Sequence, residues 1–471
     1  MNRMSPLDAS FLHVEDDVNH MHIGSVGVFE GPPPPSADLH SMVAAKLPDV
    51  PRYRQKVRFV PLELGRPVWV DDPHFNLTYH LRRTALPAPG SSAELRNLVG
   101  RVMAQQLDRT KPLWEMWVVE GLEDDHWAMV SKTHHCMVDG IAGTDLLTAI
   151  LDKSPEPLPA ADDTWTPAEE PSSSRLFRDA LTERMTSPYE QFRAVRASLR
   201  APRQLLERAT EIARGAASAA GVLRRTPESS LNGPIGPHRR WAWARTTLAD
   251  VKTVRGALGG TVNDVVLSVI TRGFRDLLIG RGEDVSDRVV RTLVPVSVRT
   301  PGERGEYNNK VSGIIAELPV KIDDPLERLA SIREQMDKLK ASGQAVAAEV
   351  LTSLSGFAPP MLLALGTRVS TRFLGSTRNV NTVTTNVPGP QFPLFACGRR
   401  MLEAFPYVPL AAPVRIGIAI FSYNGNLAFG VTGDWDTASD IDVLCRGIED
   451  GMRELEKVAA EKAGSATTAR T

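Results

Sequence analysis

One hairpin-like stretch constrains the fold of this chain more than any other. The extended runs Trp114–Gly121 and Met129–His135 flank the polar turn Leu122–Asp125, which predicts an antiparallel hairpin. Alternate side chains of a strand point to opposite faces, so His134 and His135 are expected to point in opposite directions. The pattern therefore predicts one working imidazole with a structural neighbour, rather than two histidines sharing one metal or one proton.

The rest of the chain alternates strand-like and helix-like runs on both sides of this hairpin. A chain of 471 residues with 42% hydrophobic content can bury a large core, and its length favours more than one domain. Alternating strands and helices predict an α/β fold with mixed sheets in each half. We expect an N-terminal domain, a Pro-rich linker with a basic helical crossover, a C-terminal domain and a disordered tail, at residues 1–153, 154–237, 238–460 and 461–471.

Charge and cysteine content exclude several classes of protein. The net charge is −1, with 55 basic and 56 acidic side chains, so no overall field attracts nucleic acid or an anionic membrane. Three cysteines without zinc spacing, Cys136, Cys397 and Cys445, indicate a reducing compartment. Neither a secretory signal nor a membrane-spanning run is recognisable. We therefore expect a cytoplasmic protein whose membrane contacts are peripheral.

Residues 172–225 depart from this balanced composition. They contain eleven arginines and five acidic residues, a formal charge of +6, interleaved with leucine and phenylalanine. Such a segment predicts basic amphipathic helices, which could lie on an anionic lipid surface or bind the phosphates of CoA. A solvated helical connector with Arg–Glu pairs on its surface is the alternative interpretation.

Local signals mark several helix starts and turns. Ser91 with Glu94 fits a capping box, and Thr261 is placed to cap the helix that contains Asn263 and Asp264. Asn424-Gly425 is a strong hairpin signal. Two prolines fix the turn around Gly389 by denying backbone donors.

The histidine pair limits the chemistry that this chain can perform. No Gly-x-Ser-x-Gly elbow, phosphate-binding loop or dinucleotide fingerprint is present. Cys136 follows His135 directly, so on a strand its thiol faces away, and alternation separates His134, His135 and Asp139 too far for a metal site. A single histidine can still act as a general base on a hydroxyl, amine or thiol, because its reference pKa lies near neutrality.

Asp139 and Gly140 follow the histidines at the start of a helix-like run. Asp139 could orient His135, but an N-cap or a buried Asp–Arg pair requires less unusual geometry. Gly140 allows close approach of the backbone or an unusual backbone angle.

His20, Met21 and His22 look like metal ligands at first sight. An alternating strand with its polar residues outward explains them more simply, so we expect the two histidines to face the surface.

The stretch His134–Gly140 matches the HHxxxDG motif of the CoA-dependent acyltransferase superfamily. Other stretches, in the same order, resemble the bacterial wax ester synthase/diacylglycerol acyltransferase family, and the resemblance covers almost the whole chain, most weakly at 154–240. They are Ser5–Ala9, Met21–Gly24, Pro112–Trp114, Asn263–Asp264, Val294–Arg299 and Asn386–Pro390.

This resemblance implies two chloramphenicol-acetyltransferase-like domains, joined by a long helical crossover, with a tunnel at their interface and His135 at its middle. Acyl-CoA would enter as co-substrate from one side and diacylglycerol or a long-chain alcohol from the other. His135 would take the proton from the acceptor hydroxyl, and no metal or other cofactor is expected. The family's acceptors suggest a peripheral position on the inner face of the plasma membrane or on lipid bodies, with no nucleic-acid partner.

The same resemblance assigns supporting roles to other motif residues. His134, Asp139 and Gly140 would hold the motif in place, and Asn263 would lie near the oxyanion or thioester. The full set expected along the substrate path is Asn263, Asp264, Pro112, Trp114, Asn386 and Gly389.

Two other functions fit the same fold. In one, a carrier protein instead of CoA supplies the acyl group to a polyketide- or peptide-type acceptor, although no carrier domain accompanies the chain. In the other, the protein is a non-catalytic lipid-body-binding protein, which the basic block 172–225 supports and the intact histidine motif opposes.

Overall fold

The computed structural model describes residues 2–140, 149–156, 163–183, 227–297, 311–341 and 379–468. Several predictions fall outside these residues. They concern the helix expected after Gly140, most of the basic block (184–225), the side chain of Asp139 and the surroundings of Gly140. They stay predictions.

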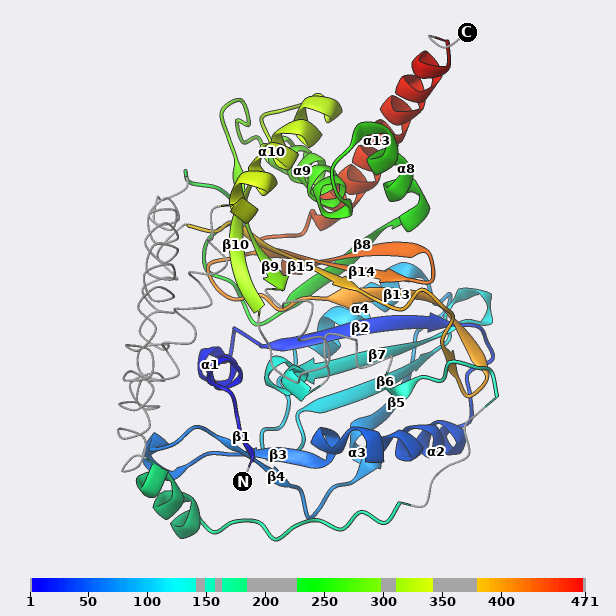
Figure 1. Cartoon of the computed structure of the whole chain (residues 1–471). Coiled ribbons are helices and arrows are strands. Elements are labelled where there is room, and N and C mark those ends of the chain that lie inside the picture. Colours follow the sequence, from blue (N-terminus) through cyan, green and yellow to red (C-terminus); the bar gives the residue numbers. More distant parts are fainter. Residues whose placement is uncertain are drawn as a thin grey trace, which may run out of the picture.

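The first of two six-stranded sheets contains the predicted hairpin (Figure 1). The strand that ends in the histidines pairs antiparallel with the strand before it, with Trp114 opposite Thr133 and Val119 opposite Ala128, as predicted. In spatial order the strands are β12 (Phe395–Ala396), β13 (Arg399–Tyr407), β2 (His22–Phe29), β7 (Trp127–His134), β6 (Trp114–Glu120) and β5 (Leu81–Ala85).

Two strands of this first sheet come from the second half of the sequence. β13 runs antiparallel beside β2, with Phe405 opposite Val26, and β12 continues the edge. The predicted domain boundary near residue 238 assigns β12 and β13 to the C-terminal half, although both pair within the first sheet. Sequence periodicity identifies a strand but not the strand beside which it lies.

The second sheet lies above the first in Figure 1 and carries a helical layer on its far side. Its strands, in spatial order, are β10 (Val311–Leu318), β9 (Val290–Ser297), β11 (Thr382–Pro388), β14 (Ile416–Tyr423), β15 (Asn426–Asp434) and β8 (Arg239–Thr247). The helices are α8 (Leu248–Leu258), α9 (Val262–Gly280), α10 (Pro325–Ala341) and α13 (Ile441–Thr468). β11 is parallel to both of its neighbours and the other pairs are antiparallel, so the predicted mixed α/β architecture is confirmed.

Smaller elements surround the first sheet. β1 (Asn2–Arg3), β4 (Val68–Asp71) and β3 (Gln55–Arg58) form a three-stranded sheet near the N-terminus, visible at the bottom of Figure 1. The helices are α1 (Pro6–Val14), α2 (Ser36–Lys46), α3 (Leu77–His80) and α4 (Ser92–Met103). Short 3-10 turns are η1 (Leu47–Asp49), η2 (Pro51–Arg54), η3 (Pro61–Glu63), η4 (Glu123–Asp125) and η5 (His135–Gly140).

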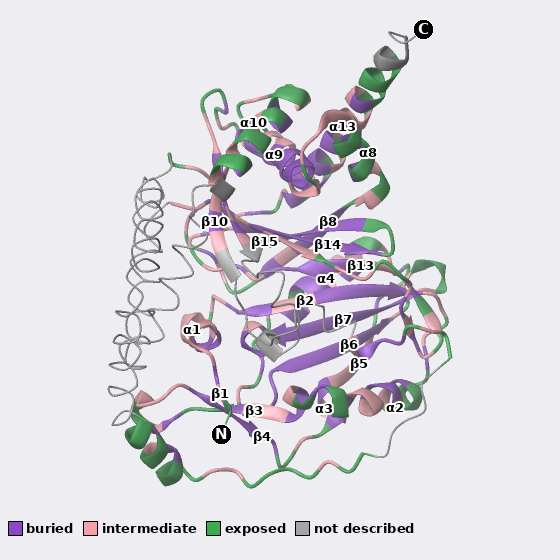
Figure 2. Cartoon of the chain, in the orientation of Figure 1, coloured by how far each residue is buried: buried purple, intermediate pink, exposed green. Residues whose placement is uncertain are grey.

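Buried side chains form separate cores on the sheet faces, and the strands are the most buried elements (Figure 2). One core packs α9 and α13 on the second sheet, through residues such as Phe274, Leu444 and Phe429. The two faces of the first sheet carry two further cores: Met129 of β7 belongs to one and its neighbour Val130 to the other. The predicted alternation along β7 is therefore confirmed.

Capping signals were read correctly, but two helices differ from the prediction. Both capping boxes, at Ser91 and Thr261, are formed. α1 was not predicted, since its short apolar pattern resembles an irregular lead-in; Ser5 caps it by accepting from the Asp8 N–H. α13 continues to Thr468 through residues predicted to be disordered, because alanine, glutamate and lysine favour helix.

Among the described helices, none combines the length and the apolar character needed to cross a membrane.

Candidate active site

The site is built where β7 ends. His134 is the last residue of β7 and His135 the first of η5. The His134 N–H donates to Leu113 O (2.9 Å), before β6, whereas the His135 N–H donates to Met21 O (2.8 Å), before β2. The backbone N–H groups of His134 and His135 are therefore bonded on opposite sides of β7. The direction of the His135 side chain is set by this turn and not by a continuing strand.

His135 is a neutral imidazole held against an aromatic ring. Its ring stacks on Phe11 of α1, with centroids 3.9 Å apart and planes 24° apart. Burial lowers the pKa of His135 to about 4, and a contact with its own backbone carbonyl offsets only part of that effect. Among described residues, its buried Nδ1 has no hydrogen-bond partner. A neutral ring of this kind can accept a proton at physiological pH.

His134 is completely buried, and its ring closes the turn that contains His135. Its Nδ1 accepts the backbone N–H of Cys136 (3.2 Å) and lies 2.9 Å from the Cys136 Sγ. Since Nδ1 is an acceptor, the proton of the neutral ring is on Nε2. Nε2 lies 3.4 Å from Oε2 of Glu15, so the ring joins a buried carboxylate to the turn.

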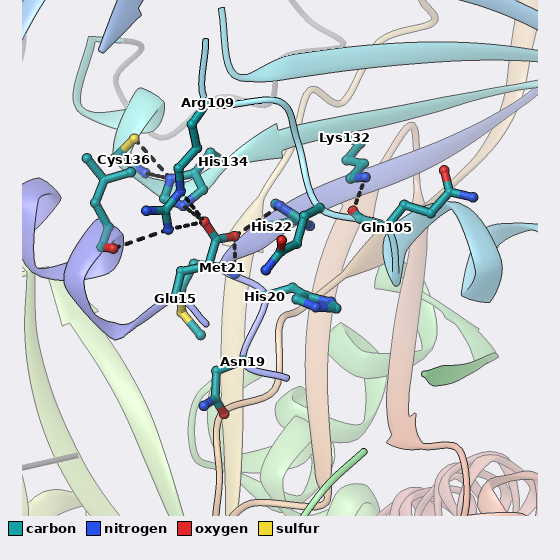
Figure 3. Close-up of polar contacts among 12 residues, drawn as sticks. Glu15, Asn19, His20, Met21, His22, Gln105, Arg109, Lys132, His134 and Cys136 are labelled. Atoms are coloured by element: carbon teal, nitrogen blue, oxygen red, sulfur yellow. Dashed lines mark hydrogen bonds and ion pairs between the residues drawn. The ribbon is translucent and has the colours of Figure 1, made fainter. Parts of the chain in front are cut away.

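Glu15, directly after α1, is the centre of a polar cluster that we call the Glu15 cluster (Figure 3). It contains the buried side chains of Glu15, His22 and His134, and Arg109, whose side chain is 38% exposed. The Oε2 of Glu15 accepts from the Arg109 guanidinium at 2.5 and 3.1 Å, and its Oε1 lies 3.2 Å from His22 Nε2. Burial opposes the charge, but hydrogen bonds from His134 and His22 hold the pKa of Glu15 well below its usual range. The carboxylate is therefore ionised.

The burial of His20 and His22 corrects the sequence analysis of this strand. An alternating strand with polar residues outward would expose them, yet they are only 5% and 1% exposed. His22 lies opposite His134 in the β2–β7 pairing, and burial lowers its pKa to about 4. The carboxylate of Glu15, contributed from outside the strand, makes burial of this imidazole possible.

Lys132, two residues before His134, is another buried polar group with a structural explanation. Its Nζ donates to Val102 O (3.0 Å) and to Gln105 O, near the C-terminus of α4 (Figure 3). A cation there satisfies free carbonyls and favours the helix dipole. Burial lowers its pKa to about 8.

Strand alternation predicts that the Cys136 thiol faces away from His135 and makes a nucleophilic role improbable. The thiol lies beside the ring of His134, 2.9 Å from its Nδ1. Burial raises the pKa of the thiol well above its usual value. It therefore stays protonated, and only thiolates are strong nucleophiles.

The segment from Pro112 to Trp114 lies beside the histidine end and serves mainly in packing. Pro112 and Trp114 are buried. The Trp114 ring stacks on His80 with centroids 4.4 Å apart, and its Nε1 donates to Tyr53 O (2.9 Å). These contacts account for the conformation of Trp114; its place on the substrate path stays a prediction.

The turn around Gly389 approaches the same core from the second sheet. A Cβ at Gly389 would lie 2.2 Å from Ser422 O and 2.4 Å from the Phe421 ring, so only glycine fits. Phe421 packs in the core cluster that contains Cys136. The end of β11 therefore packs against a residue of the core cluster that also contains Cys136. Asn386, half-buried on β11, precedes this turn.

Asn263 and Asp264 lie at the start of α9 and differ from each other. Asp264 is 1% exposed, and its Oδ2 accepts the N–H and hydroxyl of Thr261, both at 2.8 Å. Its carboxylate therefore completes the capping box, and its predicted place on the substrate path stays a prediction. Asn263 is half-buried, and its amide has no hydrogen-bond partner in the described part of the chain. No described hydrogen bond or ion pair joins this helix start to the histidine end.

Sequence reasoning missed Glu15, His22 and Arg109. Each lies in a different segment, and Glu15 and Arg109 are 94 positions apart. Only the His20–His22 pattern gave a signal, and it was assigned to the surface. A rule that a buried histidine needs a partner would have prompted a search for a carboxylate, but could not have selected Glu15.

The arrangement of the two mixed sheets occurs in solved acyltransferases and condensation domains. The trichothecene 15-O-acetyltransferase TRI3 of Fusarium sporotrichioides has 12% identity and a TM-score of 0.58, covering 96% of this chain and 94% of its own. The first condensation domain of the calcium-dependent antibiotic synthetase has 16% identity and a TM-score of 0.57, covering 98% and 96%. At these identities the likeness defines the class of fold alone, and the predicted two-domain fold is confirmed.

Closer relatives define the family. Residues 4–266 match the wax ester synthase/diacylglycerol acyltransferase catalytic domain, and residues 307–456 match the WS/DGAT C-terminal domain. A probable diacylglycerol O-acyltransferase of Mycobacterium tuberculosis, tgs1, is 39% identical over 98% of this chain and 97% of its own length. The wax ester synthase/diacylglycerol acyltransferase of Marinobacter aquaeolei VT8 has 26% identity and a TM-score of 0.68, covering 98% and 100%. This chain belongs to the wax ester synthase/diacylglycerol acyltransferase family, so the predicted family and enzyme class are confirmed.

Proposed function

We propose that this protein transfers a long-chain acyl group from acyl-CoA to the hydroxyl of diacylglycerol or of a long-chain alcohol. Family membership supports the reaction class, and the names of the relatives support these acceptors. The mechanism rests on the state of His135, a neutral imidazole at the end of a sheet. Backbone hydrogen bonds from the neighbouring strands hold the main chain of His134 and His135 in place.

In the proposed reaction His135 is the general base. Its Nδ1 is buried, so Nε2 is the nitrogen left to take the proton from the acceptor hydroxyl. The hydroxyl oxygen forms a bond to the thioester carbonyl carbon, and the carbonyl becomes a tetrahedral oxyanion. Collapse breaks the C–S bond, and the imidazolium returns the proton to the CoA thiolate. No covalent enzyme intermediate and no cofactor take part in this proposal.

General-base assistance supplies part of the rate. It typically contributes about 10²–10⁴-fold, so positioning and oxyanion stabilisation must supply the rest. Asn263 is our candidate donor to the oxyanion, because no residue that the structure describes bonds to its amide. His134 acts through the turn, whereas Asp139 and Gly140 retain the supporting roles that the motif implies.

The water-insolubility of these acceptors leads us to propose that the enzyme acts at a lipid surface, peripherally on the membrane or on lipid bodies. The basic block 172–225 is the candidate contact. Arginine-to-glutamine changes in this block should weaken liposome flotation; unchanged flotation would exclude this role.

One assay tests the reaction and its base. Thiol release from palmitoyl-CoA is measured with diacylglycerol, with hexadecanol and with no acceptor, for the wild type, His135→Ala and the control His126→Ala. We expect acceptor-dependent release that falls by about 10²–10⁴-fold only in His135→Ala. Release that survives this substitution would contradict the general-base mechanism. No release with any acceptor would favour a carrier-linked donor or a binding function.

A further inference from the structure

The Glu15 cluster contains more buried polar chemistry than the fold around it requires. The Glu15 and His134 side chains are 3% and 0% exposed, and the cluster joins the end of α1, the start of β2, the end of β7 and the segment after α4. Burying a carboxylate costs several kcal/mol unless it is paired. A hydrophobic side chain would fill the same space at a lower free-energy cost. The presence of the Glu15 carboxylate there therefore points to a function.

The polar contacts of His134 lie on opposite sides of its ring. The ionised carboxylate of Glu15, which also accepts from Arg109, lies 3.4 Å from the Nε2 of His134. On the other side of the ring, Nδ1 accepts the backbone N–H of Cys136. Only the tautomer with its proton on Nε2 satisfies both contacts.

The bond from the Cys136 N–H to His134 Nδ1 spans the proposed base. His135 lies between His134 and Cys136, so the bond from the Cys136 N–H to the His134 ring closes a turn around His135. If the proton moved to Nδ1, the ring could no longer accept from Cys136, and two N–H groups would face each other. The turn would then open at the residue that must be aligned with the acceptor hydroxyl.

We propose that Glu15 is a positioning residue for the acyl transfer, which acts by fixing the Nε2–H tautomer of His134. The inference rests on the proposed role of His135 for its effect on turnover. The expected effect of Glu15 on the His134 tautomer does not depend on the role of His135. The Glu15 assignment and the proposed base can therefore be tested, and can fail, separately.

The variant Glu15→Gln tests this assignment. Glutamine has the same length but is uncharged. Because Arg109 donates to the Oε2 position, the amide oxygen takes that place and faces His134 Nε2 as a weaker acceptor than the carboxylate, so the Nε2–H tautomer is less strongly favoured. We expect kcat to fall by about 10–100-fold, as is typical when a partner that orients a catalytic group is lost, with KM for palmitoyl-CoA unchanged. Glu15→Asp keeps the carboxylate and should retain more activity, although its shape differs more.

A matched control separates position from charge. Glu30 follows the other end of β2 and pairs with Arg400 at the surface. Glu30→Gln also removes one carboxylate that pairs with an arginine, but away from the histidines, and should leave kcat and KM unchanged.

Ring ¹⁵N chemical shifts of histidine give a readout that a merely structural role would not move. In the wild type, His134, assigned by the loss of its signals in His134→Gln, should be protonated at Nε2, and in Glu15→Gln part of the population should be protonated at Nδ1. The wild-type spectrum tests the proposal even if Glu15→Gln does not fold. A wild-type Nδ1–H tautomer would overturn it, as would unchanged turnover in Glu15→Gln. If His135→Ala stays active while the tautomer shifts as expected, the proposed base fails and the assignment of Glu15 to His134 stands.

Discussion

The histidine end of β7 and the start of α9 satisfy their buried polar groups in different ways. At α9 the partners are three residues apart, since Thr261 and Asp264 bond to each other. At β7 the partners come from distant segments, because Glu15 and Arg109 meet at His134. Local pairing stabilises an element wherever that element is placed. Distant pairing forms only in the complete fold. It therefore shows where the molecule keeps buried polar groups whose desolvation costs free energy.

The largest expected effect is a loss of stability in acid, which arises from buried histidines and not from the start of α9. His22, His80 and His135 have pKa values lowered to about 4 by burial, whereas the unfolded values are about 6.5. Between these values the unfolded state binds more protons, so the free energy of unfolding falls as the pH falls. Each histidine contributes a loss on the order of 3 kcal/mol by pH 4.

Urea unfolding midpoints between pH 6.5 and 5 measure this slope above the range in which most carboxylates titrate. His80→Phe keeps the ring stacked on Trp114 and should make the slope shallower by one histidine. A midpoint that does not change over this range would contradict the neutral, buried state of these rings.

A smaller effect is expected at Asn263, whose amide has no hydrogen-bond partner among the described residues. Asn263→Ala should lower kcat by about 10²-fold, the usual cost of one oxyanion donor, without changing the unfolding midpoint. The thiol-release assay and thermal unfolding measure the two quantities. Normal turnover would remove Asn263 from the proposed site.

The smallest effect is expected at Asp264, whose carboxylate is used by the helix cap. Asp264→Ala should lower the free energy of unfolding by about 1 kcal/mol, the usual cost of a lost cap. Glu94→Ala, at the same position of the other capping box, is the matched control and should cost a similar amount. A loss of activity in Asp264→Ala far beyond that in Glu94→Ala would support a place for Asp264 on the substrate path.

Much of this molecule was determined by the sequence itself. The hairpin that ends in two histidines, the caps at Ser91 and Thr261, and the turn at Asn424-Gly425 depend on near neighbours. The same is true of the HHxxxDG stretch, which led to the correct family. Patterns of this kind can be read because their physical causes lie within a few residues.

Tertiary structure alone decided the surroundings of those histidines. It placed β13 beside β2, buried His22 opposite His134, and brought Glu15 and Arg109 to the same ring. Sequence periodicity shows which face of a strand is buried, but not which distant charge meets that face. Pairing across long separations depends on the whole packed fold, and so the sequence identified the histidine while the structure supplied the carboxylate behind it.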